Sequence, residues 1–159
     1  MPLGDEKMLV AFSQKQDQSE HGDYADTLEE NYVIYFHDFG IIPLLIPNNL
    51  NNVEDYLRPF PIKAIIITGG NDVDPASYGG KRTEGITLTP KRDKTERALL
   101  NFAIRTKLPV LCICRGMQFL NVFFGGRLVL IKDELGEGKH LPRQNHGLEI
   151  VDARARGIL

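Results

Sequence analysis

The chain has 159 residues, which fits one compact domain whose core is large enough to fold without disulfides or metal ions. Its 42% hydrophobic and 25% charged residues are ordinary globular values and exclude a disordered or fibrous protein. The formal net charge is −2, from 19 basic and 21 acidic residues, and no run of like charge is long enough for a nucleic-acid-binding arm or a polybasic membrane patch. We therefore expect neither nucleic acid nor membrane as a partner.

The sequence shows neither the pattern of a membrane span nor that of a secretory signal. No apolar stretch approaches the roughly 18 residues of a membrane span, and the first residues, Met1 to Lys7, lack the basic and apolar regions of a secretory signal. The two cysteines, Cys112 and Cys114, would point to opposite faces of a strand and could not easily bridge. We expect a cytoplasmic protein with a single domain over residues 1–159.

The first half of the chain predicts strands alternating with helices. A strand over Met8–Phe12 precedes a polar loop over Ser13–Asp23. The following segment, Tyr24–Phe39, is predicted as a helix that ends at Gly40, because its apolar residues recur at spacings of three and four: Leu28, Tyr32, Tyr35, Phe36 and Phe39. Three further elements are then predicted: an edge strand containing Pro43 over Ile41–Ile46, a short helix over Val53–Arg58 and a strand over Lys63–Ile67.

The second half begins with an irregular segment over residues 68–92, unusually long for a loop inside a compact domain and therefore a candidate functional loop. A helix over Asp93–Thr106 follows, with one apolar side made of Leu99, Leu100, Ala103 and Ile104. The remaining predicted elements are a strand over Leu108–Ile113, a helix over Met117–Phe124, a strand over Arg127–Ile131 and a weak strand over Leu148–Val151.

This alternation predicts an α/β fold with a mostly parallel central sheet covered by helices on both faces, a three-layer sandwich. In open sheets of this kind, ligands bind beyond the carboxyl ends of the strands. Two loops follow neighbouring strands at that edge, residues 68–74 and residues 114–116. We expect them to line one crevice.

Cys114 is the sharpest candidate for chemistry. It stands between an apolar strand and a helix that opens with Gly116, which is the layout of a nucleophile elbow. In such an elbow the helix N-terminus stabilises a thiolate, and the amide of the next residue, Arg115, can bind a developing oxyanion. The alternative, a buried structural cysteine, is about as frequent for such a local context.

Two other features of this edge are less specific. The Gly69-Gly70 pair is by itself an ordinary turn, but across the crevice from Cys114 a backbone amide there could be the second oxyanion donor. Cys112 is expected to pack under a helix. Because a Cys-x-Cys pair needs two further ligands to hold a metal and no second pair exists, we expect no metal site and no cofactor.

Two long motifs carry a resemblance to a known family. Thr68-Gly69-Gly70-Asn71-Asp72-Val73-Asp74-Pro75 resembles the Gly-Gly-x-Asp-Val-x-Pro segment of the gamma-glutamyl hydrolase-like branch of class I glutamine amidotransferases, and Pro109-Val110-Leu111-Cys112-Ile113-Cys114-Arg115-Gly116-Met117-Gln118 resembles its nucleophile motif. The matching region spans residues 64–131. The resemblance implies a flavodoxin-like fold, here apparently incomplete at its C-terminal end, and cleavage of a gamma-glutamyl amide through a cysteine thioester.

The resemblance also implies roles for individual residues. Cys114 would be the nucleophile, and the backbone amides of Gly70 and Arg115 would hold the oxyanion. Gln118 would face the glutamyl group of a small-molecule substrate, with Asn71 and Asp72 as contributors to the pocket wall. The Arg115 side chain would be a structural or pocket-wall cation rather than a catalytic one. The pair Asp93 and Glu96 also fits the family pattern, but we interpret both as acidic residues that complement the dipole of their helix.

Two features depart from the family pattern. Cys112 replaces the first glycine of the Gly-x-Cys-x-Gly elbow. In addition, the family's general base is a histidine in a His-Pro-Glu segment downstream of the cysteine, and the sequence has no such segment. Its histidines lie elsewhere: His21 in a loop, His37 in a helix, and His140 and His146 in a region that resembles a non-catalytic histidine segment.

Three functions therefore stay open. The first is a thiol hydrolase or glutaminase, and the second is a catalytically impaired or non-catalytic domain of the same fold that binds a glutamyl ligand or a partner protein. The third, weaker reading is a redox-active thiol domain, based on the Cys112–Cys114 pair. A synthase partner or a homo-oligomer is compatible with the first, and the exact substrate is open.

Overall fold

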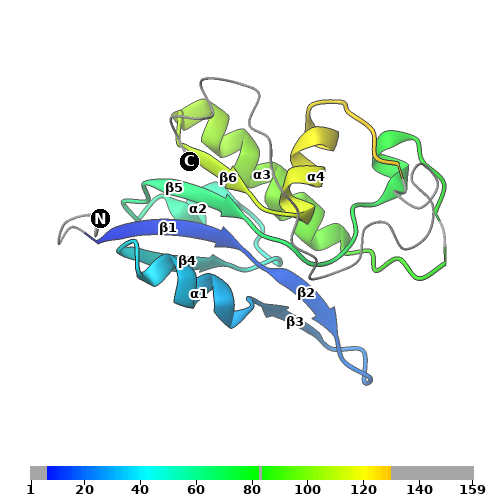
Figure 1. Cartoon of the computed structure of the whole chain (residues 1–159), viewed down its shortest axis with the longest axis horizontal. Coiled ribbons are helices and arrows are strands. Elements are labelled where there is room, and N and C mark those ends of the chain that lie inside the picture. Colours follow the sequence, from blue (N-terminus) through cyan, green and yellow to red (C-terminus); the bar gives the residue numbers. More distant parts are fainter. Residues whose placement is uncertain (1–6, 83, 130–159) are drawn as a thin grey trace, which may run out of the picture. The chain divides into compact units, whose positions relative to one another are not determined.

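The computed structural model describes residues 7–82 and 84–129 of the chain. Its central sheet has four parallel strands: β1 (Met8–Ser13), β4 (Ile41–Ile46), β5 (Ala64–Ile67) and β6 (Val110–Cys112). They lie in the order β4-β1-β5-β6 (Figure 1). In order of appearance this is second, first, third, fourth, which is the arrangement of flavodoxin-like sheets. The predicted α/β class is confirmed, as is the edge position of the strand with Pro43 within the described sheet.

Helices cover both faces of this sheet. They are α1 (Glu30–His37), α2 (Val53–Leu57), α3 (Pro90–Thr106) and α4 (Arg115–Phe123), with a short 3₁₀ helix, η1, at Pro75–Tyr78. Successive residues of a strand point to opposite faces. Phe12 and Ile66 accordingly pack with Phe36 of α1, whereas Ala11, Ile65 and Ile67 pack with the buried residues of α2, α3 and α4.

The connections of the sheet change sides between β1 and β5. The path from β1 to β4 runs through α1 on one face, whereas the path from β5 to β6 runs through α3 on the other face. The loops that follow β1 and β5 therefore diverge at the carboxyl edge of the sheet. Such a switch point is where open α/β sheets form a ligand crevice.

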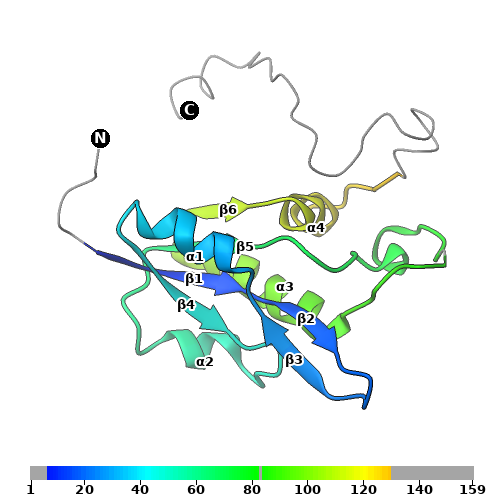
Figure 2. The ribbon, with the colours of Figure 1, turned by 60° about the horizontal axis from the view of Figure 1, so that its bottom comes forward.

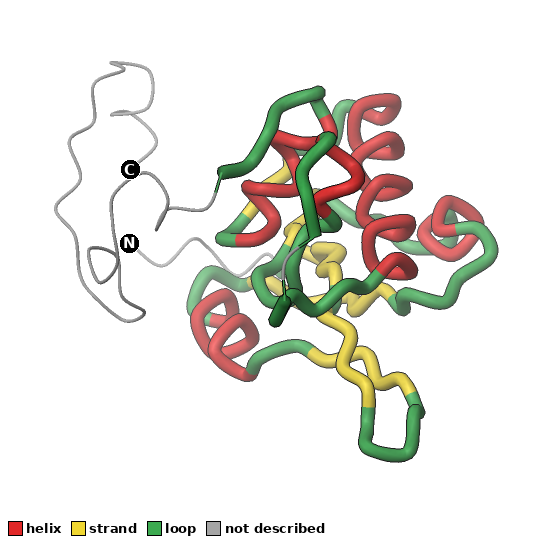
Figure 3. Tube along the Cα trace, turned by 90° about the vertical axis from the view of Figure 1, so that its right-hand side faces the viewer, coloured by secondary structure: helices red, strands yellow, loops and turns green. Residues whose placement is uncertain are grey.

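A two-stranded antiparallel hairpin, β2 (Lys15–Gln18) and β3 (Tyr24–Thr27), follows β1 directly. It continues beyond the carboxyl end of β1 and projects from the body of the fold (Figures 2 and 3). The predicted loop over Ser13–Asp23 was therefore wrong, and so was the predicted start of the first helix at Tyr24. The cause is that β2 is polar throughout and β3 holds only Tyr24 and Ala25 as apolar residues, so no hydrophobic alternation marks the hairpin.

Other predicted boundaries and faces also differ from the structure. The long helix starts at Pro90 rather than Asp93, since proline is favoured in the first turn. Three residues of predicted apolar stripes, Tyr35, Phe39 and Ile104, are exposed at 61%, 42% and 57%. Of the strand predicted over Arg127–Ile131, residues 127–129 are not in a strand, and the rest lies outside the described residues, as does the strand predicted over Leu148–Val151.

The chain divides into two compact units, residues 1–128 and residues 129–159. The sheet, the helices and the hairpin all belong to the first unit, and the second lies outside the described residues except for Val129. The single domain expected over residues 1–159 stays a prediction. Within the described part of the chain, no helix is both long and apolar enough to cross a membrane.

Candidate functional site

Cys114 stands at a sharp turn between β6 and α4. It has φ 52° and ψ −112°, in the positive-φ region that side-chain-bearing residues rarely adopt. It precedes the first residue of α4, and its side chain is exposed. A residue held in such a conformation stores local strain, and strained residues of this kind cluster at functional sites.

Gly116 makes this turn possible. A Cβ built on Gly116 would overlap the carbonyl oxygen of Ile67, the last residue of β5, and would lie 3.0 Å from the Ile67 Cγ2. Glycine therefore lets the start of α4 approach the neighbouring strand backbone closely. This close approach brings Cys114 to the loop that follows β5.

Gly69 and Tyr32 are the neighbours of Cys114 across the crevice. A Cβ built on Gly69 would lie 3.5 Å from the Cβ and 4.0 Å from the Sγ of Cys114, and 3.2 Å from the hydroxyl of Tyr32. The Gly69 N–H donates to that hydroxyl at 2.8 Å. Burial raises the pKa of Tyr32 above its usual value, the donated Gly69 hydrogen bond opposes that shift, and Glu29 and Cys114 add to it. The phenol is therefore neutral at physiological pH.

The backbone amides of Gly70 and Arg115 differ from that of Gly69. Neither donates a hydrogen bond to a group within residues 7–82 and 84–129. Arg115 is the first residue of α4, where the N–H has no partner inside the helix. Gly70 has φ 101°, a conformation that favours glycine, and it is exposed.

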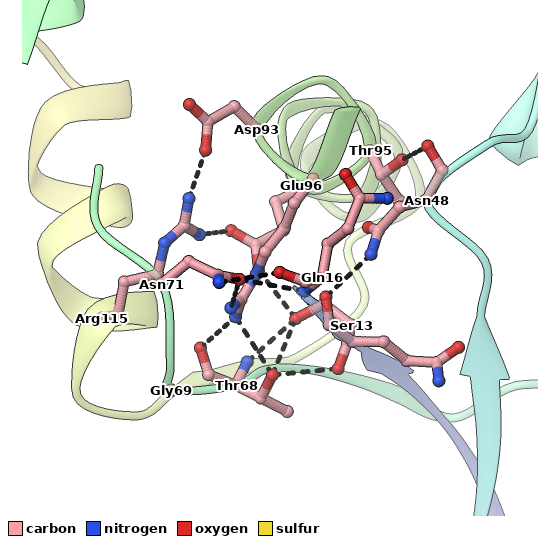
Figure 4. Close-up of polar contacts among 12 residues, drawn as sticks. Ser13, Gln16, Asn48, Thr68, Gly69, Asn71, Asp93, Thr95, Glu96 and Arg115 are labelled. Carbon is pink, nitrogen blue, oxygen red and sulfur yellow. Dashed lines mark hydrogen bonds and ion pairs between the residues drawn. The ribbon is translucent and has the colours of Figure 1, made fainter. Parts of the chain in front are cut away.

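A buried polar network lies beneath this edge (Figure 4). Glu96 is fully buried and accepts from Ser13 Oγ at 2.9 Å and from Arg92 Nε at 2.8 Å. The same carboxylate pairs with Arg115, which also pairs with Asp93. The two guanidinium groups are thus balanced by two carboxylates, which is how buried charges are tolerated.

The network ties three elements together. Ser13 ends β1, and its hydroxyl accepts from the Thr68 N–H at 3.0 Å, directly after β5. Arg92 of α3 donates through Nη2 to the Thr68 carbonyl at 2.8 Å. The carboxyl ends of β1 and β5 are therefore fixed to α3 and, through Arg115, to α4.

The charged groups of the network respond to burial. Desolvation lowers the pKa of Arg92 and of Arg115 to about 10, so both stay cationic at neutral pH. Burial raises the pKa of Asp93, and Arg115 opposes that effect. The prediction that Arg115 is a structural cation is confirmed. The helix-dipole interpretation is wrong for Glu96, which lies in the second turn of α3 and pairs with two arginines.

Asn71 and Asp72, which were predicted to contribute to the pocket wall, both form hydrogen bonds with the backbone of other segments. Asn71 accepts from the Gln16 N–H at 2.9 Å and from Arg92 at 3.1 Å, and donates to the Gln16 carbonyl at 2.9 Å. Asp72 accepts from the Thr87 N–H at 2.8 Å. Gln118 lies in the first turn of α4 with an exposed side chain.

Cys112 differs sharply from Cys114. It is the last residue of β6, is partly buried and packs against the main core cluster. Burial raises its thiol pKa to about 11. Cys112 is therefore protonated at neutral pH, as expected for a structural thiol.

Histidines and metal ligands are also placed by the structure. His37 lies at the end of α1, near Gly40, whose carbonyl accepts from the N–H of Met8 at the amino end of β1. It is thus at the opposite end of the sheet from Cys114. His21 lies in the exposed turn of the hairpin, and His140 and His146 lie outside the described residues. Within the described ranges, no cluster of three or more histidine, cysteine or acidic residues could hold a metal ion.

Sequence comparison assigns the chain to a protein family. A family model described as Peptidase C26 matches residues 8–155. The chain belongs to the Peptidase C26 family. This confirms the resemblance to the gamma-glutamyl hydrolase-like branch, and peptidases are hydrolases as a class.

Several curated relatives are similar to the chain. The glutamine amidotransferase-like protein YvdE of Lactococcus lactis is 37% identical over 139 residues, covering 82% of this chain and 58% of YvdE. Gamma-glutamyl-gamma-aminobutyrate hydrolase PuuD of Escherichia coli K12 is 31% identical over 109 residues, covering 67% of this chain and 42% of PuuD. Protein NtpR of Enterococcus hirae is 38% identical over 113 residues, covering 65% and 46% respectively. The matched region thus spans about half the length of these relatives.

Proposed function

We propose that the chain is a gamma-glutamyl amide hydrolase domain, with Cys114 as the nucleophile. The observation that carries this proposal is the positive φ of Cys114 at the start of α4, which leaves its thiol exposed beside Gly69. A helix N-terminus favours an anion at that position. The similarity to PuuD and YvdE supports a small-molecule gamma-glutamyl compound or glutamine as substrate.

The oxyanion would be held by the backbone amides of Gly70 and Arg115. Both N–H groups lack an acceptor among the described residues, whereas the Gly69 N–H is already bonded to Tyr32. This difference favours Gly70 over Gly69 as the donor from the β5 loop. Two preorganised amides facing one oxygen are the usual means of stabilising a tetrahedral intermediate.

The reaction would run in two steps. The Cys114 sulfur forms a bond to the gamma-carbonyl carbon, and the tetrahedral intermediate collapses as the carbon–nitrogen bond breaks and the amine leaves with a proton. Water then attacks the thioester, which releases the gamma-carboxylate and returns the thiol. Both steps need a group that donates and accepts protons.

Residues around Cys114 would shape the glutamyl pocket. Gln118, exposed in the first turn of α4, would contact the glutamyl group. Asn71 and Asp72 would fix the backbone of the loop that forms the pocket wall, since their side chains accept hydrogen bonds from the N–H groups of Gln16 and Thr87. Tyr32 would set the position of the Gly69 backbone, and with it the adjacent Gly70 amide.

The second candidate is a domain that binds a glutamyl ligand without turning it over. It is favoured by the position of the two described histidines, because His21 lies in the exposed turn of the hairpin and His37 lies at the opposite end of the sheet from Cys114. A thiolate without a general base can be acylated but deacylates slowly. The two candidates thus share ligand binding and Cys114 reactivity and differ in turnover.

Labelling with acivicin, an electrophilic glutamine analogue, tests the proposal. We expect a single adduct on Cys114, found by peptide mass spectrometry, and none in a Cys114→Ala variant. Modification of Cys112 instead would contradict the assigned nucleophile. Ammonia release from glutamine, measured on the same preparation, would exclude the non-catalytic alternative; labelling of Cys114 without ammonia release would favour it.

A further inference from the structure

Lys15 lies at the switch point of the sheet. It is the first residue of β2 and follows the carboxyl end of β1 by two residues. Its stem lies directly over Gly70, because a Cβ built there would be 3.0 Å from both the Cβ and the Cδ of Lys15. The ammonium group is two bonds beyond Cδ, so its stem holds it on the side of Gly70, whose amide we assign to the oxyanion site.

The ammonium of Lys15 is available to a ligand. The side chain is 32% exposed, and its Nζ lies 3.4 Å from Oδ2 of Asp17. Two other cations of this region, Arg92 and Arg115, are buried and already paired inside the fold. Arg92 donates to Glu96, Thr68 and Asn71, and Arg115 pairs with Glu96 and Asp93. Of these three cations in the described part of the chain, Lys15 is the one whose head group reaches solvent.

Asp17 supplies the opposite charge on the same face of β2. Residues two apart in a strand point to the same side, and the Thr27 hydroxyl donates to Asp17 Oδ2 at 2.9 Å and fixes the carboxylate. The side chain of Asp17 is 47% exposed. Because an exposed ion pair contributes little to folding, a ligand could separate its two members at small cost.

We propose that Lys15 and Asp17 together bind the free α-amino-acid end of the substrate, Lys15 its carboxylate and Asp17 its ammonium. This inference rests on the proposed function and deepens it by naming a substrate class. Glutamine and gamma-glutamyl amines carry both charges on one carbon, three carbons from the reacting carbonyl group. A glutamine within a peptide chain carries neither, and the site excludes it.

The inference is tested with probes that differ only in these charges. Rates of Cys114 modification are measured by intact-protein mass spectrometry for acivicin, acivicin methyl ester, N-acetyl-acivicin and iodoacetamide. Wild-type protein reacts with acivicin at least about tenfold faster than with either derivative, as expected from one charge-assisted contact each. Iodoacetamide, which has no amino-acid group, reports thiol reactivity alone.

Variants assign each charge to its residue. Lys15→Met keeps the stem over Gly70, and we expect it to slow acivicin about tenfold, to abolish the preference over the methyl ester and to leave iodoacetamide unchanged. Lys15→Arg retains the carboxylate preference. Asp17→Asn loses the preference over N-acetyl-acivicin. Lys63→Met and Asp38→Asn, exposed residues at the other end of the sheet, behave as wild type.

Three results would overturn the inference. If Lys15→Met slowed acivicin and iodoacetamide equally, Lys15 would act on the thiol and not on the ligand. If acivicin labelled Cys114 in both variants at the wild-type rate, only this inference would fail and the proposed function would stand. If acivicin did not label wild-type Cys114 while iodoacetamide did, the proposed function and this inference would fail together.

Discussion

Gly116 packs its Cα directly against the carbonyl group of Ile67, so α4 and β5 meet backbone to backbone. The contact depends on the missing side chain, and it places Cys114 beside the loop after β5. The same glycine would be hard to replace without moving the helix. Adding a methyl group at Gly116 would therefore displace the start of α4 and with it the turn at Cys114.

We expect Gly116→Ala to lower the free energy of unfolding by about 1–3 kcal/mol, the usual cost of overpacking, and to slow alkylation of Cys114. Both follow because the added Cβ overlaps the Ile67 carbonyl oxygen and pushes α4 away. Urea denaturation and iodoacetamide kinetics measure the two effects. Met117→Ala, an exposed neighbour in the same helix, is the control and should change neither. A Gly116→Ala protein of wild-type stability would show that the close contact is dispensable.

A second prediction concerns the stability that Glu96 provides, because this buried carboxylate pairs with both Arg92 and Arg115. Glu96→Gln keeps the shape but leaves Arg92 and Arg115 with only Asp93 as a carboxylate partner. Removing one partner from a buried ion pair costs about 3–5 kcal/mol, so we expect a large loss in the free energy of unfolding from chemical denaturation.

The chain offers a matched control for this substitution. Glu54 also pairs with an arginine, Arg105, but both side chains are about half exposed. Exposed pairs contribute about 0–1 kcal/mol. Glu54→Gln should therefore be nearly silent, and equal losses for the two variants would contradict the structural role given to the buried network.

The buried network also explains what the sequence could and could not reveal. The strands β1, β4 and β5 are apolar runs, and the pattern of strands and helices alone was enough to predict the parallel sheet and the pairing of two loops at its carboxyl edge. On α3, however, Arg92, Thr95 and Glu96 occupy the same face as Leu99 and Ala103 and are buried with them. A charged pair at an i, i+4 spacing on an apolar stripe was the available signal.

The hairpin could not be predicted for a different reason. Its strands hold few apolar residues, and the bonds that fix its base come from distant residues: Asn71, 55 positions from Gln16, and Asn48, which donates to Asp26. Long-range polar contacts of this kind leave no local periodicity. For the same reason no local pattern marks Lys15, which the fold places beside Gly70, or its ion-pair partner Asp17.

Asn71 gives a test of that long-range contact. Asn71→Ala removes both bonds to Gln16 and leaves the Arg92 Nη1 group without its acceptor. We expect faster amide hydrogen exchange in residues 15–27 than in wild type, because the base of the hairpin is released. Peptide-resolved exchange mass spectrometry measures it. Asn101→Ala, on the exposed surface of α3, serves as the control. Unchanged exchange in Asn71→Ala would show that the bonds from Asn48 to Asp26 are enough to hold the hairpin base.

The final prediction concerns Cys112 and alkaline pH. Burial raises the pKa of this thiol to about 11 in the folded protein, above its ordinary value of 9.0. Between these values the unfolded chain loses the proton while the folded chain keeps it, so the unfolded state binds fewer protons and stability falls as the pH rises. Below pH 9 both states are protonated and the stability is at its full value; above about 11 both have lost the proton and the loss is complete.

We therefore expect the free energy of unfolding to fall more steeply from pH 9 to about 11 in wild type than in Cys112→Ala. The comparison removes the titration of tyrosines and lysines that the two proteins share. Iodoacetamide gives an independent readout, since at pH 8 it should modify Cys114 and spare Cys112, which is protonated and partly buried. Parallel pH profiles for the two proteins, or rapid alkylation of Cys112 at pH 8, would show that β6 does not shield this thiol.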